Sequence, residues 1–260
     1  MATSDAPVSI SRVALKVRNL DRIGDFYQTA LGLNLLSRDG ESMTLGAADR
    51  PLLELRRDMA GRVYPREAGL FHNAFLLPSR EDLGRWLNHA RSNDIRLDGA
   101  SDHLVSEAIY LHDPEGNGIE IYADRPRNQW DTDGKRVNMD TVPLNLLELM
   151  AAPGTWSGAP DGTVIGHVHL QVGNVAEAEK FYVGELGFDL TSHIPSASFF
   201  ATGGYHHHLA GNVWNSRGAG KRPADALGLA EVELRAGTGS SLQAGLRSDP
   251  WGNAIRVTRV

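Results

Sequence analysis

Histidine offers this chain its main resource for chemistry. The 260 residues include ten histidines and no cysteine. Three histidines are consecutive at 206–208, and His72, His167 and His169 lie elsewhere. An imidazole can bind a divalent metal ion or transfer protons near neutral pH. Because cysteine is absent, disulfides, thiolate metal sites, iron–sulfur clusters and cysteine nucleophiles are excluded.

The elements that must position these side chains occur as an internal repeat. Residues 10–35 and 165–190 are related by a constant offset of 155, with ten identities in 26 positions. Alternating apolar residues at the start of each segment predict a half-buried strand. A short turn and a helix are expected next, with Gly32 at a left-handed cap. The recurring residues of the first copy are Ile10, Val13, Leu15, Val17, Asn19, Phe26, Tyr27, Leu31, Gly32 and Leu35.

A second repeated motif is expected to form a tight turn within a hairpin near the end of each half. Residues 113–117 read Asp-Pro-Glu-Gly-Asn, and residues 249–253 read Asp-Pro-Trp-Gly-Asn, a pattern typical of turns. The offset here is 136, so the second half has lost 19 residues. The stretch 236–245 is too rich in Gly and Ser for a full helix, which indicates that the last helix is mostly missing.

The chain is therefore expected to be an α+β protein of four βαβββ modules, the last with a shortened helix. In the second module, a strand at 69–77 precedes a helix that begins with a capping box at Ser79 and Asp82. The expected modules span about 8–66, 67–128, 162–216 and 217–260. The expected domains are 1–128 and 162–260, joined by a linker at 129–161 with one short helix.

Charge and hydropathy exclude other classes of partner. The net charge of −6 gives no basic footprint for nucleic acid. No apolar run approaches the ~20 residues of a membrane span, and the first residues lack the features of a signal peptide. We therefore expect a cytoplasmic protein that binds neither nucleic acid nor membrane. Assembly into a homo-oligomer stays open.

The duplicated pattern, with Phe-Tyr-x-x-x-Leu-Gly ending the helix and Asp-Pro-x-Gly-Asn in the last hairpin, resembles the vicinal oxygen chelate superfamily. That superfamily includes glyoxalases, bleomycin-resistance proteins and extradiol dioxygenases, and the resemblance covers all four modules. It implies two cups, each formed by two modules. Five segments are more closely similar to bacterial two-domain catechol 2,3-dioxygenase-type proteins, at 70–78, 102–110, 120–126, 166–170 and 204–208.

The resemblance also implies that a metal is held by residues on the first and last strands of the modules. The first-strand positions are Arg12, His72, His167 and, approximately, Ala230. The last-strand positions are Glu54, Glu120, Ala210 (or His208) and Arg256. The arginines in the first and fourth modules suggest that one cup is structural or binds an anion.

Which residues meet depends on how the modules pair. If the second module pairs with the third, one cup collects His72, His167 and Glu120, and open positions remain for substrate oxygens and O₂. That set favours Fe²⁺, with Mn²⁺ as an alternative. If the modules pair in sequence order, the site is glyoxalase-like and uses Glu54, His72 and Glu120, with Arg12 in place of one ligand.

Extradiol cleavage of a catechol also needs a proton acceptor and donor beside the metal. His206 and His208 are the candidates, since strand alternation is expected to turn both toward the cup and His207 away. Tyr110 matches the hydrogen-bonding tyrosine of the family and is expected to hold a substrate oxygen. Aromatic walls for a flat ring are expected from Trp214, Phe200 and Tyr205.

The predicted function is thus a metal-dependent extradiol ring-cleaving dioxygenase that takes an aromatic diol and O₂ in aromatic catabolism. Two other functions occur on this fold. One is a glyoxalase-like isomerase or lyase that uses a redox-inert metal to move a proton. The other is a metal-free protein that binds a small molecule, against which the two imidazoles and the carboxylate argue.

Overall fold

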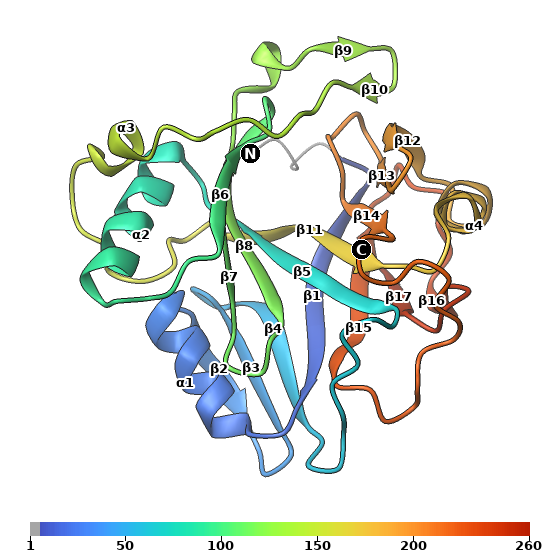
Figure 1. Ribbon diagram of the computed structural model, residues 1–260, viewed down its shortest axis with the longest axis horizontal. Helices are drawn as coiled ribbons and strands as arrows, with labels where there is room; N and C mark the ends of the chain where they lie inside the picture. The colour runs from blue at the N-terminus through green and yellow to red at the C-terminus, as the bar shows by residue number, and fades with distance from the viewer. Residues whose placement is uncertain (1–5) are drawn as a thin grey trace.

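The computed structural model of this protein describes residues 6–260 and contains two mixed β-sheets flanked by a few helices (Figure 1). The expected α+β class is confirmed. The seven-stranded sheet has the order β16-β17-β15-β1-β4-β3-β2, and the eight-stranded sheet has the order β12-β13-β14-β11-β5-β8-β7-β6. A separate two-stranded ribbon pairs β9 with β10.

The strand bounds follow the four modules. The seven-stranded sheet contains β1 (Val8–Val17), β2 (Asn34–Arg38), β3 (Ser42–Ala47), β4 (Arg50–Arg57), β15 (Gly228–Ala236), β16 (Gly245–Ser248) and β17 (Ala254–Arg259). The eight-stranded sheet contains β5 (Gly69–Leu76), β6 (Gly99–Asp102), β7 (Ser106–His112), β8 (Gly118–Asp124), β11 (Val164–Gln171), β12 (Asp189–Ile194), β13 (Ala197–Ala201) and β14 (Leu209–Asn212).

The modules pair second with third and first with fourth. Strands β5 and β11 are antiparallel neighbours in the eight-stranded sheet, and β1 and β15 are antiparallel neighbours in the other. The preferred pairing from the sequence is therefore confirmed, and pairing in sequence order is wrong. Each half of the chain contributes one module to each sheet. The domain limits 1–128, 129–161 and 162–260 stay a prediction.

The helices begin and end where the sequence signals lie. They are α1 (Leu20–Ala30), α2 (Arg80–Ser92), α3 (Leu146–Met150) and α4 (Val175–Glu179), which continues as a π-helix at Lys180–Glu185. The Ser79 hydroxyl accepts a hydrogen bond from the Asp82 N–H at 3.1 Å, as the capping box predicted. Gly32 has φ +68°, the left-handed cap expected there. In the described part of the chain no helix lies between β15 and β16, so the shortened last module is confirmed.

The two repeated motifs meet in one contact that recurs in each half. The Tyr27 hydroxyl donates to the Asp113 carboxylate at 3.4 Å, and the Tyr182 hydroxyl donates to Asp249 at 3.0 Å. Each aspartate also accepts backbone N–H groups of its own turn, including that of Asn117 or Asn253. These contacts tie the first module to the second and the third to the fourth.

The largest apolar core joins the two sheets and their helices, and it includes the buried Leu15, Phe75 and Trp86. Because side chains alternate along a strand, the opposite face of the eight-stranded sheet is left for other residues. Tyr122 and its apolar neighbours form a small separate cluster on that face. No helix within residues 6–260 is long and apolar enough to cross a bilayer.

The expected linker takes part in the structure around the site. It contains β9 (Thr132–Asp133), β10 (Arg136–Val137) and the expected short helix α3. Helix α3 packs against α2, and the chain then continues to β11. Residues 139–141 line the principal cavity, a role that the sequence did not indicate.

Candidate metal centre and its pocket

Three side chains converge from three neighbouring strands of the eight-stranded sheet. His72 lies on β5, His167 on β11 and Glu120 on β8. Glu120 Oε2 lies 2.9 Å from His72 Nε2 and 3.1 Å from His167 Nε2, and the two Nε2 atoms are 3.3 Å apart. All three side chains are buried. Two imidazoles and one carboxylate that meet at one point form the donor set of a facial metal site.

The buried environment favours the protonation states that bind a metal. Burial lowers the pKa of His167 to about 4, although Glu120 opposes that shift. Burial alone would raise the pKa of Glu120, but the adjacent His167 and His72 outweigh it and hold that pKa well below its ordinary range. A neutral imidazole and an ionised carboxylate are the forms that ligate. The residues present therefore fit a divalent metal.

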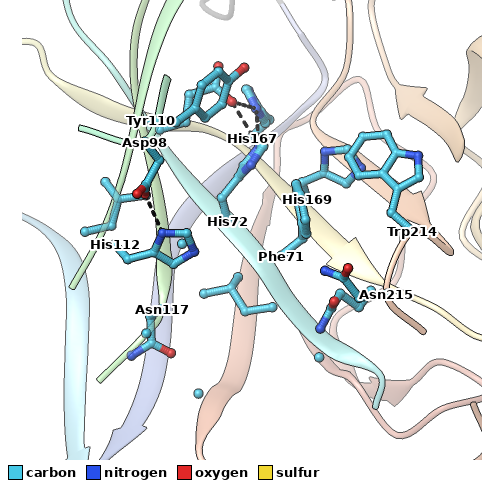
Figure 2. Close-up of a pocket in the computed structure, with 18 of the residues that line it drawn as sticks. Phe71, His72, Asp98, Tyr110, His112, Asn117, His167, His169, Trp214 and Asn215 are labelled. Atoms are coloured by element: carbon cyan, nitrogen blue, oxygen red, sulfur yellow. Dashed lines mark hydrogen bonds and ion pairs between the residues drawn. The ribbon is translucent and has the colours of Figure 1, made fainter. Parts of the chain in front are cut away.

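A cavity of about 750 Å³ opens beside the three converging side chains. Figure 2 shows Tyr110 above His72 and His167, with His169, Phe71 and Trp214 farther along the wall. Phe71 lies at a register shift between β5 and β11, which is why it lines the cavity together with its neighbour His72. Of the expected aromatic walls, Trp214 is in place. Phe200 and Tyr205 are buried and lie outside the lining, so that expectation was wrong for them.

Tyr110 is held at the cavity by a partner that the sequence analysis missed. Its hydroxyl lies 2.6 Å from His103 Nε2, and His103 Nδ1 lies 2.8 Å from the carbonyl oxygen of Asp140 in the linker. A carbonyl only accepts, so Nδ1 carries the proton and Nε2 accepts from the tyrosine. Burial, followed by the charge of Glu120, raises the pKa of Tyr110 well above its ordinary range. The phenol therefore stays protonated beside the metal-binding triad, which is His72, His167 and Glu120.

The orientation expected for His206 and His208 is wrong. His207 lines the cavity, and the other two do not. The parity argument assumed a strand through 206–208, but β14 begins only at Leu209, after left-handed glycines at 203 and 204. His208 Nδ1 instead accepts a hydrogen bond from the Thr202 N–H at 3.3 Å, and its buried Nε2 has no hydrogen-bond partner in the described part of the chain.

His206 lies behind His207 and orients it. Its Nε2 is 2.9 Å from the Asp124 carboxylate, and its Nδ1 is 2.8 Å from His207 Nδ1. A His206 ring that carries one proton donates it from Nε2 to the carboxylate and accepts at Nδ1, so His207 then carries its own proton on Nδ1. That leaves the Nε2 lone pair of His207 free. The His207 ring centroid is 4.1 Å from that of His167, so this imidazole lies directly beside the triad.

The seven-stranded sheet holds ion pairs where its own metal site would be. Arg12 contacts Glu54 at 2.8 Å and Glu233 at 2.9 Å, and Arg256 contacts Glu231 at 2.7 Å. Glu231, not the expected Ala230, carries the first-strand side chain of the fourth module on this face. The guanidinium groups neutralise the carboxylates that a metal would need. The residues of this cup therefore do not fit a metal, and its structural or anion-binding role stays a prediction.

Comparisons with known proteins agree with this geometry. The sequence model of the glyoxalase/bleomycin resistance protein/dioxygenase superfamily matches residues 9–121 and 164–243 of this chain. A catechol-2,3-dioxygenase from Bacillus subtilis (strain 168) is 40% identical over an alignment of 229 residues that covers 85% of this chain and 80% of that protein.

Solved structures share the fold at low sequence identity. One from Bacillus subtilis, named as a candidate dioxygenase, superposes with a TM-score of 0.63 at 12% identity, covering 96% of this chain and 84% of the other. Glyoxalase I from Zea mays superposes with a TM-score of 0.56 at 15% identity, covering 96% and 92% of the two chains.

Proposed function

Because the chain belongs to the glyoxalase/bleomycin resistance protein/dioxygenase superfamily, we propose that it is an extradiol ring-cleaving dioxygenase that acts on catechol-type diols. The observation that carries the proposal is the convergence of His72, His167 and Glu120 at the inner end of a cavity. Support comes also from the Bacillus relative, whose name is that of such an enzyme.

The three convergent side chains would hold Fe²⁺, with Mn²⁺ as the alternative. Such a metal would chelate the two vicinal oxygens of the diol and supply the redox chemistry that couples ring oxidation to O₂. The ligands leave one side of the site toward the cavity, where the diol would enter. Phe71, whose ring centroid lies 5.3 Å from that of His72, offers an aromatic face to a flat ring.

Tyr110, on β7, and His207, in the loop before β14, approach the site of the diol from different elements. Tyr110 is a neutral phenol that donates its proton to His103, and we assign its oxygen to accept a hydrogen bond from one hydroxyl of the substrate. His207 has a free Nε2 lone pair, and we assign it to accept a phenolic proton and to return a proton later. His206 acts through His207 as a positioning residue, and Asp124 fixes the His206 tautomer. The acid–base role first assigned to His206 and His208 thus passes to the histidine between them.

Anaerobic reconstitution tests the proposal directly. The purified protein is loaded with Fe²⁺ or Mn²⁺, mixed with catechol, and then exposed to air. We expect stoichiometric O₂ uptake and a yellow muconic semialdehyde product. Silence across several catechols with both metals, combined with turnover of a hemithioacetal in the presence of Ni²⁺ or Zn²⁺, would establish the glyoxalase-like alternative instead.

Metal content of two variants tests the ligand assignment independently of activity. His167→Ala removes one of the three convergent donors, and we expect it to lose most of its bound metal. Glu54→Ala removes a carboxylate of the other cup, so it serves as a matched control and should retain the metal of the wild type. Retained iron in His167→Ala, measured by inductively coupled plasma spectrometry, would refute the site.

A further inference from the structure

The cavity is much larger than a single diol ring requires. Its volume of about 750 Å³ is that of a site for a drug-sized ligand. A catechol bound at the triad would fill only the inner end and leave the outer part to water. The outer part must therefore either be irrelevant to the substrate or hold a substituent of the ring.

The chemistry of the cavity changes along its length. On β11, His167, His169 and Gln171 follow one another on the cavity side, and Gln171 pairs in register with Gly69 of β5. At about 3.3 Å per residue, Gln171 lies roughly 13 Å along the strand from His167. Between the two ends the wall is aromatic, since the ring centroids of Phe71 and Trp214 are 5.0 Å apart. Figure 2 shows Asn117 and Asn215 at the end away from Tyr110.

A half-buried cation lies at that outer end. The guanidinium of Arg222 lines the cavity beside Gly69, where a side chain would lie 3.6 Å from Nη2. Arg222 Nη1 donates to the Leu229 carbonyl at 2.6 Å, and Nη2 donates to the Leu227 carbonyl at 3.2 Å. Its Nε is buried without a hydrogen-bond partner among residues 6–260. In that part of the chain the guanidinium forms no ion pair with a carboxylate, although Asp249 influences it from a distance.

A guanidinium that is partly removed from water without an adjacent counter-ion is less stable than one that contacts a carboxylate. Two backbone carbonyls position this group but do not neutralise it. A carboxylate in the cavity would complete it with short, charge-assisted hydrogen bonds. The neighbouring amide of Gln171, which already donates to the Glu67 carbonyl at 3.2 Å, marks this end as polar.

We infer that the preferred substrate is a catechol whose ring carries an extended, mainly apolar substituent that ends in a carboxylate, and that Arg222 binds this carboxylate. The inference rests on the proposed function, because it takes the diol to lie at the triad. The aromatic middle of the cavity contacts the substituent. The separation of His72 and Gly69 along β5 places the carboxylate roughly 10 Å from the diol.

Affinity measured without turnover tests this assignment. The probes are 5-(3,4-dihydroxyphenyl)pentanoate and its methyl ester, titrated anaerobically into metal-loaded protein by calorimetry. We expect the wild type to bind the acid at least about tenfold more tightly than the ester. Arg222→Met should reduce that ratio to near one, and Arg222→Lys should retain part of it because the cation remains. Lys221→Met makes the same change in net charge at the exposed neighbouring residue, so it should keep the wild-type ratio.

The acid-to-ester ratio is taken within each variant, so a general loss of affinity does not imitate the effect, and thermal melting reports whether Arg222→Met is folded. An equal affinity for acid and ester in the wild type, or an unchanged ratio in Arg222→Met, overturns the assignment. Cleavage of unsubstituted catechol by the wild type is scored separately. Its absence overturns the proposed function, whereas the ratio decides the role of Arg222.

Discussion

Gly166 is expected to be intolerant of even the smallest side chain, because it forms a bulge that aims His167 into the site. The register between β11 and β5 shifts between Ile165 and His167, which leaves Gly166 as the extra residue. A Cβ at Gly166 would lie 1.7 Å from the Tyr122 hydroxyl oxygen and 2.8 Å from Tyr122 Cζ. Tyr122 is fully buried, so its ring has little room to move.

The expected cost of Gly166→Ala can be worked from these contacts. Tyr122 Oη must move by more than 1 Å to reach van der Waals distance, which breaks its 2.8 Å hydrogen bond to the Tyr205 hydroxyl. Losing that bond costs about 1 kcal/mol, and overpacking costs about 1–3 kcal/mol more. The better strand conformation of alanine offsets about 0.5–1 kcal/mol. We expect a net loss of about 1–3 kcal/mol in the free energy of unfolding.

Urea denaturation and thermal melting measure this loss, and about 2–4 °C of Tm corresponds to each kcal/mol. Gly184→Ala is the matched control, because a Cβ there meets nothing within 4 Å. Tyr122→Phe removes the nearest clashing atom, so in the double variant the cost of Gly166→Ala should be partly relieved. Wild-type stability in Gly166→Ala, or strict additivity with Tyr122→Phe, would refute the reasoning.

Three further expectations concern the site and the second cup. His207→Ala should lower kcat for catechol by about 10²-fold or more, whereas His208→Ala should mainly lower Tm; equal kcat values from O₂ uptake would contradict this. Tyr110→Phe should lower kcat/KM by about tenfold through one lost hydrogen bond, and an unchanged value would remove its role. Burial favours a higher pKa for Glu54. The hydrogen bond from Arg56 and the charges of Arg12 and Arg56 outweigh burial, so the folded pKa of Glu54 lies below 4.5. Stability from Glu54 is therefore present above pH 4.5 and lost as the pH falls through the folded value. The gap of about 1 kcal/mol between wild type and Glu54→Gln at pH 7 should narrow as the pH is lowered below 4.5, and a pH-independent gap would contradict that sign.

Much of the fold was predictable because the chain repeats itself. A constant offset relates strands and helices, and Asp-Pro-x-Gly-Asn specifies its turn through local hydrogen bonds to the aspartate. The triad could also be predicted, since His72 and His167 occupy first-strand positions and Glu120 a last-strand position that the resemblance implies for metal ligands. Only one pairing of the modules brings the three together.

Other parts of the site depend on contacts that no spacing encodes. The orientation of His207 is set by a turn at Gly203 and Gly204, so strand alternation did not apply to the histidine run. His103 lies with Tyr110 in the segment 102–110, which the resemblance had already singled out, so it could have been named as a candidate. Its tautomer, however, is set by a carbonyl of the linker at Asp140. Arg222 likewise reaches the cavity from a loop whose path follows from packing against β5 and β15.

Each module contacts two others, one through a tyrosine–aspartate hydrogen bond and one through a shared sheet. The metal ligands lie on both sides of the boundary between the second and third modules. His72 and Glu120 come from the first half of the chain, and His167 comes from the second. A chain severed near Gly154 would therefore yield two fragments, each lacking half of both sheets and neither able to assemble the three donors alone. Their reassociation should tighten as metal is added, because an ion that binds only the joined state favours that state by mass action. The ion would then stabilise a complex of two polypeptides, and a chelator that removes it would weaken that complex.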